Sequence, residues 1–123
     1  MDRAELTERL RAQTTISQAT FAGFDWADFD AQEARFTACH FADAQFSNTN
    51  FAGAVFTRCH LPRSRFSRCS LTEAQFTDCA FADSSSVASG ATFFMSELRQ
   101  ACFVTCDLSF ARFERADLFA ITF

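Results

Sequence analysis

A bulky apolar residue returns at every fifth position along most of the chain. Helices repeat about every 3.6 residues and simple strands every two, so neither element produces this period. A fixed short period is typical of repeat proteins, in which each unit buries its apolar side chains against its neighbours. Only Ala31 departs from the rule of a bulky side chain. The repeated positions are Ile16, Phe21, Trp26, Ala31, Phe36, Phe41, Phe46, Phe51, Phe56, Leu61, Phe66, Leu71, Phe76 and Phe81, then Phe93, Leu98, Phe103, Leu108, Phe113, Leu118 and Phe123.

A small residue precedes most of the bulky residues by two positions, as Cys39 precedes Phe41. Residues two apart point to the same side of an extended segment, so both side chains are expected to face the interior. The residue between them is expected to face outward. The last two residues of a unit are mostly polar or small, as in Ser47 and Asn48, which predicts a corner.

Units such as Ala44-Gln45-Phe46, Ala74-Gln75-Phe76 and Ala116-Asp117-Leu118 resemble the unit of the pentapeptide-repeat family, often written A-(D/N)-L-x-x. The resemblance extends over about residues 16–123. It implies an all-β fold, a right-handed quadrilateral β-helix in which four units make one turn and residues 20 apart stack. Adjacent turns would lie about 4.8 Å apart, as strands in a sheet do.

We expect two parts, an N-terminal helical cap over residues 1–15 and the β-helix over residues 16–123. Leu6 and Leu10 lie four residues apart in a charged segment, as on one side of a short amphipathic helix. Repeat proteins need capped ends, so this helix is expected to cover the first turn. The chain has one Pro and three Gly, which predicts a corner geometry that suits ordinary residues.

Near the start of the repeats, the sizes of neighbouring residues are exchanged. Phe24 and Phe29 take the small position, while Ala31 takes the bulky one. We interpret this as local compensation that conserves the volume of the core.

A second irregularity follows Phe81. Phe93 comes twelve residues later rather than ten, so two residues are expected to be inserted. Serines and a glycine predict a bulge or small loop at about residues 82–92, with Val87 pointing inward. We interpret this segment as tolerated variation rather than as a recognition loop.

The composition narrows the function classes. The net charge of −4 argues against direct nucleic-acid binding, which needs a basic surface. No segment resembles a signal peptide and no apolar run approaches the ~20 residues of a membrane span. We therefore expect a cytoplasmic protein without membrane contact, whose six cysteines are reduced.

Cys39, Cys59 and Cys79 are spaced 20 apart and are expected to stack inside the β-helix. Parallel thiols do not converge as tetrahedral zinc requires, and their directions disfavour a disulfide. We therefore interpret them as small buried residues. Cys102 lies between two inward positions, so it is expected to be the one accessible thiol.

His40 and His60 are also 20 apart and are expected to stack on an outer side. They lack a clear third ligand and an adjacent nucleophile, so we predict no metal, no cofactor and no catalytic residues. Cys102 could share their side two turns later, depending on the register after the insertion.

Apolar residues gather at the corners of the C-terminal third, whereas earlier corners carry small or charged residues. An exposed apolar patch often marks an interface, and the last turn has no helical cap. We therefore expect a homodimer formed through the C-terminal turns, with packing within a monomer as the alternative. The candidate interface residues are Phe94, Met95, Val104, Phe110, Phe119 and Phe123.

The resemblance implies a non-catalytic protein–protein interaction scaffold, such as an accessory or adaptor piece of a bacterial secretion or effector system. An alternative is a DNA-mimicking protein that binds type II topoisomerase (DNA gyrase) and protects it from quinolones. Such mimics carry an acidic surface, whereas this sequence mixes both signs at its corners, so no all-acidic column is expected.

An enzyme is the third alternative. A narrow β-helix filled with phenylalanine leaves no pocket of the roughly 300 Å³ that ligand sites need. Only the 82–92 segment or a dimer seam could provide one.

Overall fold

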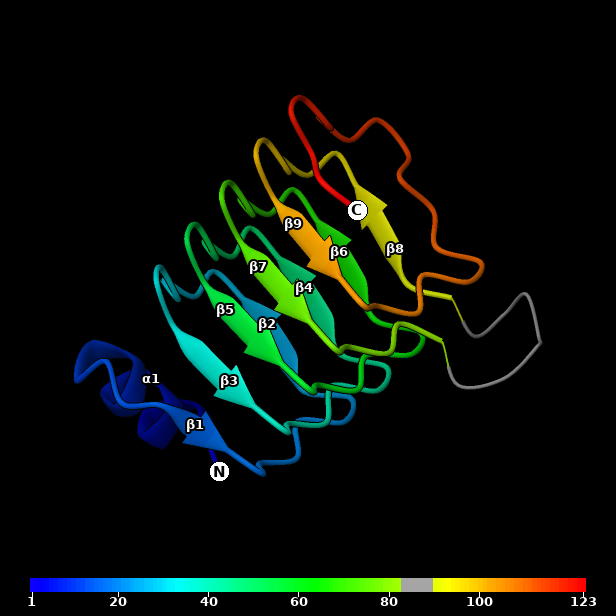
Figure 1. The fold of residues 1–123 in the computed structure, drawn as a ribbon. Helices are drawn as coiled ribbons and strands as arrows, with labels where there is room; N and C mark the ends of the chain where they lie inside the picture. Colours follow the sequence, from blue (N-terminus) through cyan, green and yellow to red (C-terminus); the bar gives the residue numbers. More distant parts are fainter. Residues whose placement is uncertain (83–89) are drawn as a thin grey trace.

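The computed structural model describes residues 1–82 and 90–123, which form one helix followed by a ladder of short parallel strands (Figure 1). Helix α1 spans Arg3–Arg11, and the strands lie in two separate sheets. The first sheet, called the odd sheet, contains β1 (Ile16–Ser17), β3 (Arg35–Thr37), β5 (Val55–Thr57), β7 (Gln75–Thr77) and β9 (Cys102–Val104). The even sheet contains β2 (Asp25–Ala27), β4 (Gln45–Ser47), β6 (Arg65–Ser67) and β8 (Thr92–Phe94).

Two further columns of backbone contacts close each turn between the sheets. Parallel bridges join Thr20 to His40 and His40 to His60 on one side, and Asp30 to Asn50 on the other. The chain is therefore a four-sided parallel β-solenoid with an N-terminal helix. This confirms the predicted fold class.

The register between turns is 20 residues until the insertion, as in Phe46 opposite Phe66. Across the insertion the register is 27, with Phe66 opposite Phe93. Seven residues are therefore inserted there, and the prediction of two was wrong. That prediction assumed that two five-residue steps separate Phe81 from Phe93. In the structure Phe93 is one step after Phe81, so twelve residues replace five. Val87 lies outside the described residues.

Stacked aromatic rings fill the interior. Phe36 and Phe56 stack at 5.0 Å between ring centroids, and Phe56 and Phe76 stack at 4.7 Å. Phe29 is buried in a small position, 5.2 Å from the ring of Trp26, while Ala31 is buried in a bulky one. The expected exchange of sizes therefore keeps the first turn filled.

The corners adopt a backbone conformation that ordinary residues disfavour. Within the described residues, most units place one residue at positive φ two positions after the bulky one, as at Ala38 (φ 54°) and Arg58 (φ 54°). Only Gly23 and Gly53 supply glycine at such corners. One repeated corner geometry therefore holds ordinary residues, as predicted, but at a cost that was not expected, since L-residues in the left-handed region cost about 1–2 kcal/mol each.

The small inward positions carry hydrogen-bond donors at several corners. The thiol of Cys59 donates to the carbonyl oxygens of Phe36 and Thr57 at 3.5 Å, and Ser96 Oγ donates to equivalent carbonyls at 3.2 Å. The cysteines therefore do more than fill space, because each thiol adds a donor to corner carbonyls such as that of Thr57, which also accepts the Ala38 N–H. Sequence reasoning treated them as apolar and missed this role.

Helix α1 covers the N-terminal end of the β-helix. Asp2 caps the helix, since its carboxylate accepts a hydrogen bond from the Glu5 backbone N–H at 2.8 Å. Leu6 is fully buried and Leu10 packs against the core, as their spacing predicts. Charged residues occupy the outward side.

Candidate interaction surfaces

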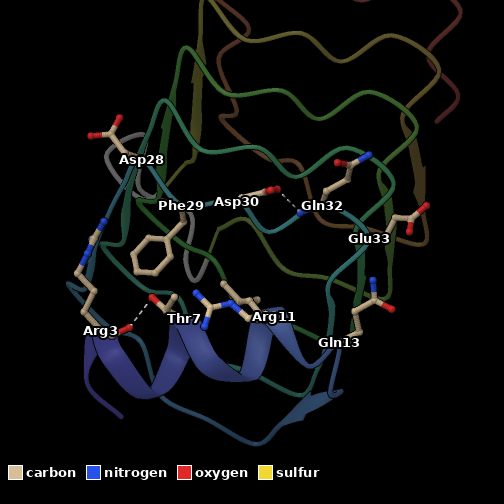
Figure 2. A pocket seen from close by; sticks show the side chains of 10 residues that line it. Arg3, Thr7, Arg11, Gln13, Asp28, Phe29, Asp30, Gln32 and Glu33 are labelled. Atoms are coloured by element: carbon tan, nitrogen blue, oxygen red, sulfur yellow. Dashed lines mark hydrogen bonds between the residues drawn. The ribbon is translucent and has the colours of Figure 1, made fainter.

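An open cleft lies between α1 and the first turn of the β-helix (Figure 2). Its volume is about 560 Å³. The guanidinium of Arg3 lies 4.0 Å above the ring of Phe29 and donates a hydrogen bond to the carbonyl of Ala27 at 2.5 Å. The expectation that a pocket could form only at the 82–92 segment or at a dimer seam was wrong. A helix of nine residues covers only part of the open end, which leaves a gap at its edge.

The cleft has charged walls. Arg11 pairs with Glu8 at 3.2 Å, and the hydroxyl of Thr7 donates to the carbonyl of Arg3 at 2.8 Å. No histidine, cysteine or serine is among its described lining residues, and the one hydroxyl there, that of Thr7, is engaged by the Arg3 carbonyl. Carboxylates dominate its far wall, which Asp28, Asp30 and Glu33 provide.

Two of these carboxylates begin an acidic surface that continues along one side of the β-helix. Its bridge column runs through Asp30, Asn50, Ser70, Glu97 and Asp117 and contains no basic residue. The corner column of the same side contains Glu33, Gly53, Glu73, Gln100 and Ala120. We call this side, with Arg99 as its one basic residue, the acidic face.

The acidic face accounts for the net charge of the chain. Of the 15 acidic and 11 basic residues in the sequence, the described residues of this face include five acidic and one basic, a net charge of −4 that equals that of the whole sequence. Arg99 is itself paired with Asp117 at 3.3 Å. No column is wholly acidic, as predicted, since neutral residues such as Asn50 and Ser70 interrupt it, but every charge in these two columns is negative. Acidic and basic residues are mixed along the sequence, but the stacking of the turns brings acidic residues together on one side of the β-helix.

The candidate interface residues lie around the C-terminal end rather than in one lateral patch. Phe119 is 62% exposed and Phe123 is 68% exposed, whereas Phe94 is half-buried with Arg68 lying 5.9 Å from its ring. The exposed side chains of Met95, Val104 and Phe110 project from different sides of the turn.

The last turn leaves the end of the core uncovered. Phe123 stacks on Phe103 with ring centroids 5.9 Å apart, and within the described residues nothing covers its other face. Leu108, Phe113 and Leu118 are only partly buried beside it. The C-terminal end therefore presents a small apolar surface made of core side chains.

His40 and His60 are neighbours on the outside, as their spacing predicts. Their ring centroids are 5.7 Å apart. Cys102 is not on their side: it lies opposite Gln75 in the odd sheet, while the histidine column continues to Ala80 and Asp107. Among the residues that the structure describes, no three His, Cys, Asp or Glu side chains are grouped to hold a metal ion.

Two thiols, rather than one, are partly exposed. Cys102 faces outward as predicted, but Cys106 is also partly accessible. A hydrogen bond from the Cys79 thiol lowers the pKa of Cys106 to about 7, whereas burial raises the pKa of Cys69 to about 11. Near neutral pH the thiol of Cys106 therefore ionises more readily than that of Cys69.

The described residues contain one helix, and it is too short and too polar to cross a membrane. Their geometry defines a protein of the parallel β-solenoid class. Its lateral sides differ from one another in charge, and its C-terminal end exposes apolar side chains.

Comparisons with known proteins agree with this class. Residues 49–85 match the protein family described as "Pentapeptide repeats (8 copies)". No curated protein sequence matches the chain. These residues and the fold together confirm the resemblance to the pentapeptide-repeat family.

Two solved structures illustrate the likeness in fold. The pentapeptide repeat protein Rfr23 from the cyanobacterium Cyanothece 51142 has a TM-score of 0.52 at 12% identity, over 99% of this chain and 96% of that one. QnrB1, a plasmid-mediated fluoroquinolone resistance protein, has a TM-score of 0.51 at 21% identity, over 85% of this chain and 48% of that one. This chain thus spans about half the length of QnrB1, and at such identities the likeness concerns the fold alone.

Proposed function

We propose that this protein is a non-catalytic scaffold that binds a partner protein through the acidic face. The observation that carries the proposal is the sorting of charge, with five carboxylates and one paired arginine on a single side. Such a surface attracts a basic partner and aligns it during encounter. A basic segment lying along this face could place its end in the cleft beside α1, whose wall shares Asp30 and Glu33.

The filled interior supports a binding role over catalysis. Rings such as Phe46 and Phe66 stack at 4.4 Å, so the described part of the β-helix has no room for a ligand between them. The rigid stacked turns instead hold outward side chains at fixed spacing, which favours recognition by the surface.

A titration with an oligolysine peptide tests the proposed face. The variant Glu73→Gln with Glu97→Gln should weaken binding and reduce its dependence on salt concentration, because both carboxylates lie on the acidic face. The control Asp25→Asn with Asp78→Asn changes the net charge equally on other sides of the molecule. Equal effects of the two double variants would show that only net charge matters, and would refute the proposal.

A second candidate function is imitation of DNA toward a type II topoisomerase. The acidic face supports it, since such mimicry needs a continuous negative surface. QnrB1, which shares the fold, is a fluoroquinolone resistance protein. A DNA gyrase supercoiling assay with and without a quinolone separates this candidate from the first. If the protein neither inhibits gyrase nor protects it from the quinolone at high protein concentration, this candidate is excluded. Oligolysine binding through the acidic face would still support the scaffold in that case.

We also propose that two copies associate through their C-terminal ends. The uncovered ring of Phe123 and the exposed ring of Phe119 support a second copy as the occupant, because the same apolar surface would be buried on both. Light scattering should give the mass of a dimer for the native chain and of a monomer for Phe119→Ser with Phe123→Ser. A native monomer at high concentration would refute this association.

A further inference from the structure

Within the described residues, two hollows lie on the even sheet, on a different side from the acidic face, and they share Arg65. The larger one, of about 540 Å³, spans β2, β4 and β6. The smaller one has a volume of about 380 Å³ and spans β6 and β8. Its described lining residues are Arg63, Arg65, Gly90, Thr92, Arg112 and Glu114.

Three of these residues form one outward column. Thr92 lies directly opposite Arg65 in the sheet, and Arg112 forms the next bridge with Thr92. Backbone hydrogen bonds from Thr92 to Ser64 (2.9 Å) and from Arg112 to Ala91 (3.0 Å) hold this register. The two arginines are therefore two strand spacings apart, about 10 Å between their Cα atoms, with the threonine hydroxyl between them.

The two guanidinium groups in this column lack partners in the described part of the chain. Neither Arg65 nor Arg112 makes an ion pair or a side-chain hydrogen bond there. Arg63, at the rim, is held by Asp43 in a bidentate pair at 2.8 and 3.1 Å. Among the lining residues that the structure describes, Glu114 is the one carboxylate.

The register keeps these like charges together. A carboxylate at position 92 would have relieved their repulsion, but the chain places a hydroxyl there instead. A hydroxyl can donate to an anion without neutralising the arginines, so the column can accept negative charge from outside. Guanidinium groups match the geometry of phosphate oxygens in bidentate contacts.

We propose that this hollow binds the phosphate group of a small phosphorylated molecule. Arg65 and Arg112 contact its oxygens from either side, and the Thr92 hydroxyl donates between them. A diphosphate fits better than a single phosphate, because it offers oxygens to both arginines across the column. The site extends beyond the proposed scaffold function and depends on no residue of the acidic face.

The test is a titration of the full chain with inorganic phosphate and with pyrophosphate, followed through the NMR signals of the arginine side chains. We expect saturable binding in the millimolar range, with pyrophosphate the tighter ligand. Arg65→Gln and Arg112→Gln should each weaken pyrophosphate binding about tenfold, through the loss of charge-assisted hydrogen bonds. Glu114→Gln should strengthen it, because it removes the one negative charge in the lining.

Arg35 provides the matched control. It is exposed at the same repeat position in the odd sheet, but its neighbour in the next turn is Val55 rather than a second arginine. Arg35→Gln should therefore leave pyrophosphate binding unchanged. Absence of saturation at concentrations on the order of 10 mM, or equal weakening by Arg35→Gln, would overturn the proposal. Chloride at matched ionic strength should not reproduce the shifts, and if it does, the arginines respond only to screening.

Discussion

Replacing a corner residue in the left-handed region by glycine should stabilise the protein, whereas glycine destabilises ordinary strand positions. Ala38 occupies a corner at φ 54°, and its side chain is a single, partly buried methyl group. Its N–H donates to the carbonyl of Thr57 at 2.9 Å, a bond that glycine retains. Ala38→Gly therefore changes the conformational cost at the corner and little else.

The expected magnitude follows from two opposing effects. Removing Cβ relieves about 1–2 kcal/mol of strain in the left-handed region. The added freedom of glycine in the unfolded chain subtracts about 0.4–1 kcal/mol. The difference is a rise of about 0–1.6 kcal/mol in the free energy of unfolding, and its midpoint of about 0.8 kcal/mol corresponds to roughly 2–4 °C in Tm for a chain of this size.

Ala44→Gly is the matched control for this substitution. Ala44 is fully buried and is not among the residues with positive φ. Glycine there costs about 0.5–1 kcal/mol in chain entropy, together with about 0.8 kcal/mol for the buried methyl. The same chemical change should therefore stabilise the protein at one position and destabilise it at the other.

Thermal unfolding followed by circular dichroism measures both variants against the native chain. Opposite signs would support the assigned corner geometry. If Ala38→Gly lowered Tm as much as Ala44→Gly does, the corner would carry no relievable strain and the reasoning would fail.

Three further predictions follow from the core, the thiols and the surface. Phe51→Ala should lower the free energy of unfolding, measured by chemical denaturation, by about 3–5 kcal/mol, and Phe51→Leu by less than about 1.5 kcal/mol. Equal losses for the two variants would contradict a ring packed between turns. The rate of iodoacetamide labelling of Cys106 should increase with pH through about 7, since the thiolate is the reactive form. Cys79→Ala should move this increase to higher pH, because it removes the hydrogen bond that lowers the pKa of Cys106. An unchanged pH dependence would show that Cys79 does not lower the pKa of Cys106. Arg63→Ala should change the free energy of unfolding by less than about 1 kcal/mol, because its pair with Asp43 is exposed to solvent; a larger loss would assign this pair a structural role.

Much of the fold could be predicted from the sequence because the repeat is local. The bulky position every fifth residue identified buried side chains such as Phe51 and Phe76, and the spacing of Leu6 and Leu10 identified the helix. Each of these depends only on neighbours within one unit or one helical turn.

The candidate surfaces were less predictable because they combine residues from several turns. Asp30 and Glu97 belong to the same column only when the insertion is seven residues, so the expected insertion of two residues does not bring them together. The cleft beside α1 depends on where the helix docks, which the helix sequence alone does not specify.

The sequence by itself determined the period, the inward and outward positions and the N-terminal helix, since these follow from side chains a few residues apart. Only the tertiary structure decided which outward residues share a side, how the insertion shifts the register and that ordinary residues occupy left-handed corners. The physical reason is that closing each turn joins residues 20 or 27 positions apart through backbone hydrogen bonds. Charges of both signs along the chain are thereby sorted into one acidic side and one column in which two arginines have no ion-pair partner among the described residues.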